Sequence, residues 1–381
     1  MKLVFISNYY NHHQSEISKC FLSITNGEYT FIATVPMDSE RVTMGWAIEC
    51  PPYVVQYNDN TRECDEMILS ADVVIIGAAP IRLVKKRLKC KKLVFMYTER
   101  PYRNGVNIVR SIQYFIQNYL FYGRFSSLYC LCASAFTSAD YNRTHTFINK
   151  TYKWGYFPEV VRYDIDDIIA KKNKKEVRLL FVSRMITLKH PEYPVLAAKR
   201  LKDEGVSFQM TMIGKGEKEK EIIDMINDMQ VADVVIFKNE AMPPESVREY
   251  MLEANIFLFT SDKQEGWGAV MNESMNSGCA VIASSKIGSV PFLINDGING
   301  CIYRDGNFDD FYIKLKMLCL DKVKREQMGI NAYKTMTDIW NAEVATQRLM
   351  LLIKDINLNG YSDRYLEGPC SKASVLRDDW Y

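Results

Sequence analysis

The chain has 381 residues, 48% of them hydrophobic and 25% charged, and its formal net charge is +2. This length predicts about two domains, the composition is that of a globular protein, and the near-neutral charge argues against a general nucleic-acid binder. The ten cysteines include no C-x-x-C pair, so neither a zinc site nor a disulfide framework is expected, and the cytosol is the simplest location.

The first predicted element is a strand over residues 3–7, a short apolar run. This run is too short for the apolar core of a signal peptide, and no later stretch approaches the roughly 18 apolar residues of a membrane-spanning helix. We therefore expect a protein that is neither exported nor transmembrane.

A polar loop follows this strand and carries His12, His13 and Gln14, with a helix expected to begin near Ser15. Ligands of doubly wound sheets bind beyond the carboxyl ends of strands, so the loop is a candidate site. Its three residues could bind a phosphate or an acceptor hydroxyl. Exposed loop residues without a binding role are the alternative.

Further strands are expected in the first half of the chain, separated by segments long enough for crossover helices. They span residues 31–35, 54–57, 73–77, 93–97, 128–133 and 152–158. This alternation is typical of α/β folds. Glu99 follows one of these strands and could orient or deprotonate an acceptor hydroxyl. An ion pair with Arg100 is the alternative.

Residues 81–92 contain seven basic side chains and no acid. Ile81, Val84 and Leu88 recur at helical spacing, which predicts a basic amphipathic helix. Such a helix can dock on anionic lipid headgroups, or its apolar stripe can pack on the sheet.

An aromatic cluster beside two arginines follows and suits a membrane interface, a lipid acceptor or a core. The cluster contains Tyr114, Phe115, Tyr119, Phe121, Tyr122 and Phe125, with Arg110 and Arg124. Together these segments predict peripheral attachment to the inner face of the plasma membrane.

Asp164 and Asp166 match a metal-binding D-x-D pattern, but acids in the first turn of a helix explain them better. Residues 171–175 form a charged, non-periodic link, and we place the domain boundary there. We thus expect a first domain of residues 1–170, a second domain of residues 171–345, and a C-terminal helix and tail of residues 346–381.

The second domain is predicted to open with a strand over residues 178–183, followed by Arg184 and Lys189. Two cations near a helix terminus can neutralise a diphosphate without a metal, although a basic loop after a strand is the alternative. Strands are expected at residues 209–213, which end at Gly214 in a lone G-x-G, and at residues 234–237, before Lys238. A helix over residues 245–254 follows.

Residues 256–285 read as a buried strand, a polar loop, a helix starting near Ala269 and a second strand. Gly266 and Gly268 allow the backbone to approach a ligand, and the helix terminus adds unpaired amides, which predicts an anion site. Glu265 and Glu273 can both face that ligand and accept hydrogen bonds from hydroxyls. A nucleotide-sugar, part phosphate and part sugar, fits this arrangement.

The sequence of this segment resembles a known family. The pattern E-G-W-G-x-x-x-x-E, followed by S-G-C-A-V-I-A, resembles the donor-site signature of retaining glycosyltransferases of family four. The resemblance is specific over residues 175–356 and implies the α/β GT-B fold: two Rossmann-like domains, parallel sheets facing a central cleft, and C-terminal helices that cross back to the first domain. The chain departs from the family in three places. It lacks a glycine pair after the first strand, Glu99 or Arg100 replaces a donor-contacting histidine, and Phe292 replaces a common glutamate.

The resemblance implies a metal-independent, retaining transfer of a hexose-type sugar from a nucleoside diphosphate, with a UDP-sugar favoured. The acceptor would be a saccharide or lipid-linked saccharide in bacterial capsule, exopolysaccharide or lipopolysaccharide synthesis. Arg184 and Lys189 would stabilise the leaving diphosphate, Glu265 would hold sugar hydroxyls and Glu273 the ribose hydroxyls. The other donor-binding positions would be Gly266, Trp267, Gly268, Ala269, Val270, Lys238 and Gly214. No cofactor and no metal are expected.

Other functions are open at this point. A nucleotide-sugar epimerase has the same two-domain architecture and is the main alternative. A non-catalytic sugar-nucleotide binding protein and a metal-dependent transferase using Asp164 and Asp166 are further alternatives. A dinucleotide-dependent oxidoreductase is disfavoured because no G-x-G-x-x-G follows the first strand.

Overall fold

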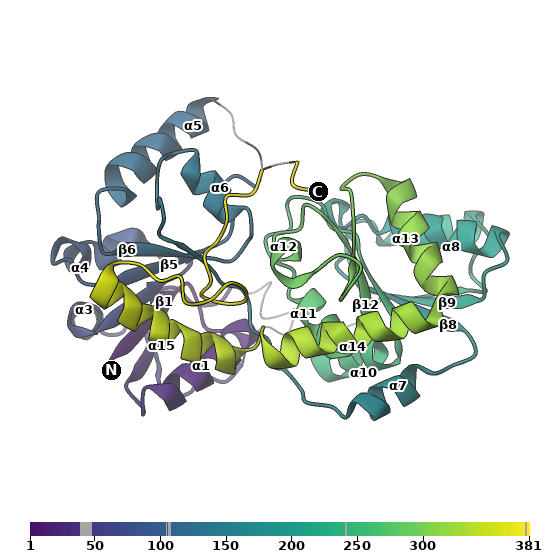
Figure 1. Ribbon diagram of the computed structural model, residues 1–381, viewed down its shortest axis with the longest axis horizontal. Coiled ribbons are helices and arrows are strands. Elements are labelled where there is room, and N and C mark those ends of the chain that lie inside the picture. The colour runs from purple at the N-terminus through teal and green to yellow at the C-terminus, as the bar shows by residue number, and fades with distance from the viewer. Residues whose placement is uncertain (39–47, 104, 106–107, 241, 378) are drawn as a thin grey trace. The chain divides into compact units, whose positions relative to one another are not determined.

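The computed structural model describes residues 1–38, 48–103, 105, 108–240, 242–377 and 379–381, and Figure 1 shows its helices and strands. The chain divides into two compact units. Unit 1 contains residues 1–159 and 340–380, and unit 2 contains residues 160–339 together with Tyr381. The end of the chain therefore returns to the first unit, as the family resemblance implies.

Both boundaries lie earlier in the chain than the sequence predicted, at residues 159/160 and 339/340. The reason at the first boundary is helix α7 (Ile165–Lys172), which packs on helix α10 (Pro244–Glu253) of unit 2. The buried Lys172 ammonium donates hydrogen bonds to the carbonyl oxygens of Met251, at 2.9 Å, and Ala254. The charged link over residues 171–175, which contains this lysine, is thus part of the second unit.

Unit 1 is built on a seven-stranded parallel sheet with the order β3-β2-β1-β4-β5-β6-β7. The strands are β1 (Leu3–Ser7), β2 (Tyr29–Ala33), β3 (Val54–Gln56), β4 (Val73–Ile76), β5 (Val94–Thr98), β6 (Leu128–Cys132) and β7 (Thr151–Lys153). All four residues of β4 are buried, which is the pattern of a central strand covered on both faces. Each strand lies within a few residues of its predicted position.

The helices of unit 1 include one that begins earlier than expected. They are α1 (His12–Ile24), α3 (Thr61–Ser70), the 3-10 helix η1 (Ile81–Val84), α4 (Lys85–Lys89), α5 (Ile108–Phe115), the π-helix η2 (Ile116–Tyr122), α6 (Thr137–Asn142) and α15 (Ala342–Asn359). Asn11 caps α1, because its side-chain oxygen accepts a 2.8 Å hydrogen bond from the His13 N–H. The prediction of a start near Ser15 was therefore wrong, and His12, His13 and Gln14 form the first turn of the helix.

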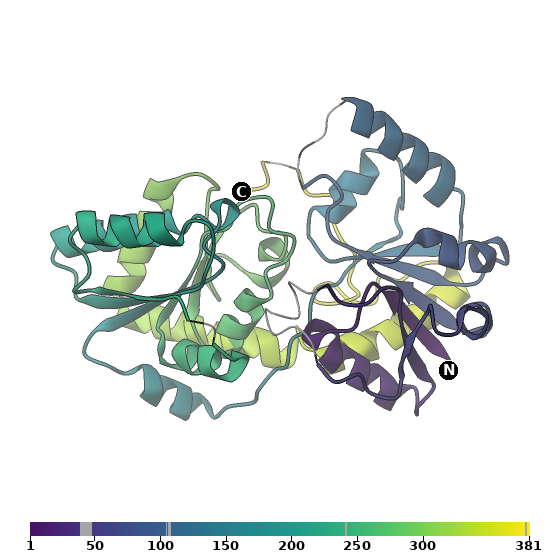
Figure 2. The same ribbon diagram turned by 180° about the vertical axis from the view of Figure 1, so that it is seen from behind.

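Helix α15 lies along α1 and ties the chain end to unit 1, as Figures 1 and 2 show. The Trp340 ring stacks on Phe157 with 6.4 Å between the ring centroids, and the Tyr129 hydroxyl donates to the Gly360 carbonyl at 2.8 Å. Leu349 and Leu352 of α15 are buried as well.

Residues 81–92 do not form the continuous amphipathic helix that the sequence predicted. They fold as η1 and α4, and Arg87 points inward with 1% of its surface exposed. Its guanidinium donates hydrogen bonds to the carbonyl oxygens of Ile68, Ala71, Asp72 and Leu93 at 2.5–3.1 Å, and burial lowers its pKa to about 10. Arg87 is thus part of the fold, and the remaining six basic side chains are exposed.

Unit 2 contains a six-stranded parallel sheet with the order β10-β9-β8-β11-β12-β13. The strands are β8 (Val177–Val182), β9 (Phe208–Ile213), β10 (Val235–Lys238), β11 (Ile256–Phe259), β12 (Ala280–Ser284) and β13 (Cys301–Tyr303). Every residue of β11 and β12 is buried, as their apolar sequences predict. The short edge strand β13 was not predicted.

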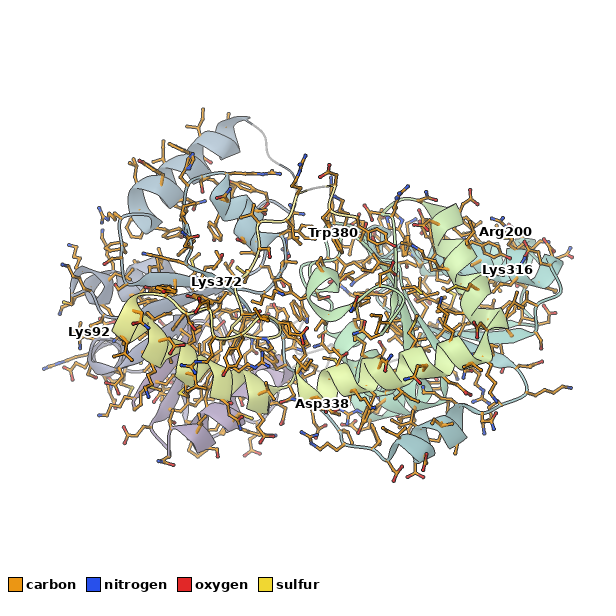
Figure 3. All side chains as sticks on the ribbon, viewed as in Figure 1. Lys92, Arg200, Lys316, Asp338, Lys372 and Trp380 are labelled. Atoms are coloured by element: carbon orange, nitrogen blue, oxygen red, sulfur yellow. The ribbon has the colours of Figure 1, made fainter. Side chains whose placement is uncertain are left out.

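The remaining helices of unit 2 surround this sheet. They are the 3-10 helix η3 (Thr187–Lys189), α8 (Glu192–Asp203), α9 (Glu219–Asp228), α11 (Val270–Asn276), α12 (Val290–Leu293), α13 (Phe308–Leu320) and α14 (Lys322–Asp338). Salt bridges join α8 and its C-terminal end to α13: Arg200 pairs with Asp309 at 2.8 Å and Lys316 pairs with Glu204 at 2.7 Å, and Figure 3 labels both basic residues.

Asp164 has the structural role that the sequence indicated. Its carboxylate accepts a 2.8 Å hydrogen bond from the Asp166 N–H and caps α7, with Asp166 and Asp167 in the first turn near the positive end of the helix dipole. The D-x-D letters therefore mark a helix start.

Candidate functional site

The topology of unit 2 places the candidate site between β8 and β11. The chain leaves β8 toward β9 and β10 on one side and returns on the other side at β11, which creates the switch point where ligands of such sheets bind. The loops after the two strands are joined there. The Asp262 N–H donates to the Leu188 carbonyl at 2.9 Å, and the Thr260 hydroxyl donates to the Lys189 carbonyl at 2.7 Å.

Lys189 and Glu265 meet at this switch point. The Lys189 Nζ forms a salt bridge with Glu265 Oε2, and the Ser261 hydroxyl donates to the same oxygen at 3.0 Å. The two charged side chains are 11% and 14% exposed, so solvent screens their attraction only partly. The structure thus brings together two predicted residues from separate loops, and they neutralise each other.

Arg184 follows β8 on the same side of the sheet but remains exposed. Its guanidinium makes no ion pair with any side chain in the part of the chain that the structure describes. Lys189, at the end of the same loop, is neutralised by Glu265. The exposed Arg184 guanidinium therefore leaves one positive charge in this loop available to bind an anion.

The G-x-G after β9 has a packing reason. Gly214 and Gly216 have φ of +149° and +157°, and a Cβ at these positions would lie 1.8 Å from the Ser183 carbonyl oxygen and 2.3 Å from that of Met185. The Met185 N–H donates to the Lys215 carbonyl at 2.7 Å. The glycines therefore let the β9 loop lie directly against the backbone that carries Arg184.

Lys238 is positioned mainly by its backbone. Its carbonyl accepts a 3.0 Å hydrogen bond from the Gly214 N–H, which joins the ends of β10 and β9. Its side-chain Nζ lies 5.5 Å from the centre of the Tyr250 ring and 3.8 Å from a carboxylate oxygen of Glu240. This ammonium therefore already has an aromatic and an acidic neighbour.

The loop before α11 is held by a buried tryptophan. The Trp267 side chain is 1% exposed, and its Nε1–H donates to Asn272 Oδ1 at 2.9 Å, so the indole holds the loop in place. Gly268 has φ of +79°, and a Cβ there would come within 2.2 Å of the Phe259 ring. The N–H groups of Gly268 and Ala269 have no backbone acceptor within the described residues, which leaves them available to an anion.

Glu273 lies on α11, the helix that begins just after Ala269. Its side chain is partly exposed, but burial raises the pKa of its carboxyl to about 7, while the positive charge of Arg248 opposes this rise. The carboxyl is therefore poised between its neutral and ionised forms near neutral pH.

Unit 1 holds the other predicted site residues. Glu99 accepts a 2.9 Å hydrogen bond from the Tyr156 hydroxyl and pairs with Arg103 at 3.1 Å. Arg100 instead forms a buried salt bridge with Asp140 at 3.1 Å, so the alternative of a Glu99–Arg100 pair was wrong.

The histidines at the start of α1 lie close to the same tyrosine. The His12 and His13 rings are 3.9 Å apart between centroids, and His13 is 5.7 Å from the Tyr156 ring. Gln14, next along the helix, is buried. Through Tyr156 the structure thus connects Glu99 with His13, whereas the sequence analysis treated them separately.

Several residues that shape these sites were not predicted from the sequence. Ser261 supports Glu265, Asn272 holds Trp267, and His190, in a left-handed backbone conformation with φ of +48°, bonds through Nδ1 to Glu192 at 2.7 Å. This contact raises the pKa of His190. The position of Ser261, two residues after the end of β11, was a readable signal, while the other two contacts depend on loop conformations.

The described residues offer no cluster of metal ligands. No group of three or more His, Cys, Asp and Glu side chains among them lies where it could hold a metal ion. Over the same residues, no helix combines the length and the hydropathy needed to cross a membrane.

Unit 2 resembles a known protein family. Residues 164–335 match the family model for glycosyl transferases of group 1. Among curated proteins, the amylovoran biosynthesis glycosyltransferase AmsK of Erwinia amylovora is 30% identical over 168 residues, 42% of this chain and 39% of AmsK. The capsular polysaccharide biosynthesis glycosyltransferase CapM of Staphylococcus aureus is 25% identical over 171 residues, 44% of this chain and 43% of CapM. The aligned part therefore spans less than half the length of each relative.

Solved structures resemble nearly the whole chain. Anabaena Alr3699/HepE in complex with UDP covers 93% of this chain and 100% of its own, with a TM-score of 0.66 and 13% identity. Sucrose-phosphate synthase from Thermosynechococcus elongatus covers 94% of this chain and 100% of its own, with a TM-score of 0.67 and 14% identity. These likenesses show that the two Rossmann-like units form the GT-B glycosyltransferase fold, as predicted.

Proposed function

We propose that this chain is a glycosyltransferase of group 1 that moves a sugar from a nucleoside-diphosphate donor to a saccharide or lipid-linked saccharide. The observation that carries the proposal is the Lys189–Glu265 salt bridge at the switch point of unit 2, beside the exposed Arg184. The family match over residues 164–335 covers all three residues. An anion-binding cation next to a hydroxyl-binding carboxylate suits a ligand that joins a diphosphate to a sugar.

In the proposed reaction the bond between the anomeric carbon and the donor phosphate oxygen breaks, and its electron pair remains on the diphosphate. Arg184 and Lys189 stabilise this growing negative charge. The acceptor oxygen forms the new bond on the face from which the diphosphate leaves, and its proton passes to the leaving phosphate. The configuration is retained, and neither a protein nucleophile nor a metal or other cofactor is needed.

The remaining donor contacts follow from the loop before α11. Glu265 exchanges its bond to Lys189 for hydroxyls of the sugar, and Glu273 in its ionised form accepts hydrogen bonds from the ribose. The N–H groups of Gly268 and Ala269 bind the phosphate or sugar, with Gly266 and Val270 on either side. Gly214 and Lys238 border the nucleoside through their backbone.

Unit 1 is proposed to bind the acceptor. Glu99, held by Tyr156, orients the acceptor hydroxyl, and His12, His13 and Gln14 contact the acceptor or its phosphate. A peripheral position on the cytoplasmic face of the membrane would bring the protein to a lipid-linked acceptor.

A hexose carried by UDP is the proposed donor, in bacterial capsule, exopolysaccharide or lipopolysaccharide synthesis. Two observations on similar proteins support this choice. HepE crystallised in complex with UDP in one structure and with UDP-glucose in another. AmsK and CapM are named for polysaccharide synthesis.

The test is thermal unfolding of the full chain with UDP, GDP, ADP and NAD, each with and without EDTA. A ligand at about 100 times its dissociation constant adds about 2.7 kcal/mol to the stability. We expect UDP alone to raise the melting temperature, with or without EDTA. Stabilisation only by NAD, or stabilisation by UDP that EDTA abolishes, would overturn the proposed site. UDP-glucose converted to another nucleotide-sugar without an acceptor would identify an epimerase.

A further inference from the structure

Helices α5 and η2 expose an unusual amount of apolar surface. The residues concerned are Val109, Ile112, Phe115, Ile116, Tyr119 and Leu120, with 43–65% of each side chain exposed. A globular protein leaves single apolar residues at its surface, but a contiguous patch marks a contact with another molecule. We call these six residues the α5–η2 patch.

The fold of unit 1 does not need the α5–η2 patch, because another face of the same helices packs inward. Tyr114 contacts the Tyr102 ring at 5.1 Å between centroids, and Asn118 and Tyr122 are buried. These inward residues recur every four positions. Figures 1 and 2 show α5 on the side of the sheet opposite α1 and α15, at the outside of unit 1.

The patch continues onto the basic segment of the same unit. A shallow apolar pocket of about 430 Å³ is lined by Ile116, Gln117, Leu120 and Phe121 from η2 and by Ile81 from η1. The apolar surface of η2 therefore extends to Ile81 of η1, and Lys85, the first lysine after η1, stands beside it.

Cations border this apolar surface. The Arg124 guanidinium lies 5.3 Å from the centre of the Phe121 ring, and the Lys85 ammonium lies 5.6 Å from the same centre. Between Asp72 and Asp140 the sequence has eleven Lys and Arg residues and a single acid, Glu99. Further exposed cations of residues 81–92 are Arg82, Lys86, Lys89 and Lys91, whereas Lys92 donates to the Leu69 carbonyl of α3 at 2.8 Å and lies away from α5, as Figure 3 shows.

We propose that the α5–η2 patch docks on an anionic lipid membrane, with its apolar side chains inserted at the headgroup level and the surrounding cations on the lipid phosphates. Apolar and aromatic residues rimmed by Lys and Arg are the composition of interfacial membrane helices. A second copy of this chain is the less suitable occupant, because the two cationic borders would repel each other.

This inference divides the roles of the two segments from which the sequence predicted membrane attachment, residues 81–92 and the aromatic cluster that follows them. Arg87 of the first segment is buried, so that segment supplies cations only, and the exposed apolar face of α5 and η2 supplies the insertion. The inference deepens the proposed function and rests on it only for the use of a lipid-linked acceptor, since the surface itself is independent of sugar transfer.

The experiment is flotation of the full chain with vesicles of phosphatidylcholine, with and without phosphatidylglycerol, in the absence of nucleotide-sugar. We expect the wild type to float with the anionic vesicles. The triple variant Ile112→Ser, Ile116→Ser, Leu120→Ser should bind them at least about tenfold more weakly, since three exposed apolar side chains are lost. The matched control is Ile313→Ser, Leu320→Ser, Val323→Ser in unit 2, whose side chains are slightly more exposed, at 62–78% against 52–58%, and it should bind as the wild type does.

A charge variant and a measurement on the wild type complete the test. Lys85→Gln with Lys89→Gln should weaken binding to anionic vesicles, whereas Lys220→Gln with Lys334→Gln should not. Hydrogen exchange of the wild type should show vesicle-dependent protection over residues 108–122, which does not depend on a variant folding.

Three results would overturn the proposal. They are wild-type protein that binds neither vesicle type, a triple variant that floats as the wild type does, and vesicle-dependent hydrogen-exchange protection found only outside residues 108–122. A wild-type dimer that the triple variant converts to a monomer would make the patch a protein interface instead. UDP-induced stabilisation of the triple variant should equal that of the wild type. Failure of the membrane proposal is thereby distinguished from failure of the donor site.

Discussion

The Lys189 ammonium and the Glu265 carboxylate form a salt bridge between two loops, although the residues lie 76 positions apart in the chain. The loops follow β8 and β11, which are neighbours in the sheet. A diphosphate that binds Lys189 competes with Glu265 for the ammonium, so removal of the carboxylate should affect donor binding and turnover differently.

Replacing the carboxylate is the first prediction. In Glu265→Gln, UDP should bind about tenfold more tightly, because Lys189 is released and a negative charge near the diphosphate is removed. Turnover should fall at least about tenfold, because the sugar hydroxyls lose a charged acceptor. Calorimetry with UDP and UDP release in the presence of acceptor measure the two effects. Glu253→Gln, which breaks an exposed pair with Arg178, is the control; weaker UDP binding in Glu265→Gln would contradict the assignment.

Replacing Arg184 should lower turnover but leave the stability of the fold nearly unchanged. Arg184→Ala is expected to lower turnover about 100-fold, the effect of removing one group that stabilises transition-state charge. Its melting temperature should stay near that of the wild type because the side chain is exposed. Arg62→Ala, which removes another exposed arginine, should change neither quantity. Wild-type turnover in Arg184→Ala would remove this residue from the diphosphate site.

Glu273 predicts a pH dependence of stability. Its pKa is about 7 in the folded chain against 4.5 ordinarily, so the folded state holds more protons between these values. Stability should therefore fall as pH rises from about 4.5 to about 7 and then level off. Glu273→Gln should flatten this slope and be more stable than the wild type at pH 8 by about 1–3 kcal/mol. Chemical denaturation at several pH values measures this, with Glu253→Gln as the control.

The same carboxyl predicts a pH dependence of donor binding. If the ionised form accepts hydrogen bonds from the ribose, UDP should bind the wild type more weakly as pH falls below about 7. Glu273→Gln should lose this dependence. Equal pH profiles of UDP affinity in the two proteins would argue that the ribose lies elsewhere.

Gly214 should tolerate no side chain. In Gly214→Ala the new Cβ would meet the Ser183 carbonyl oxygen at 1.8 Å, so the loop after β8 has to move, at a cost of about 3 kcal/mol or more. Gly297→Ala is the matched control, with φ of +79° and no atom within 4 Å of its Cβ, and should cost about 1–2 kcal/mol. Urea unfolding compares the variants. Equal losses in the two would show that the contact with Ser183 is not tight.

The sequence by itself determined the elements of this protein. Apolar runs such as residues 256–259 predict buried strands because both faces of a parallel sheet are covered, and nearly every strand was found within a few residues. The early start of α1 was also readable, since Asn11 is a strong capping residue. The candidate residues Arg184, Lys189, Glu265 and Glu273 came from their positions after strands and from the family pattern.

Tertiary structure alone decided which of these residues meet. The partnership of Lys189 with Glu265 depends on β11 adding beside β8, and strand order is a property of long-range pairing that no local pattern encodes. The same holds for Arg87, which belongs to a basic run but is drawn inward by carbonyl groups from residues 68–72 and 93. It also holds for helices α5 and η2, whose apolar residues look alike in the sequence. Only the inward packing of Tyr114 and Tyr122 shows which residues are left outside as the α5–η2 patch.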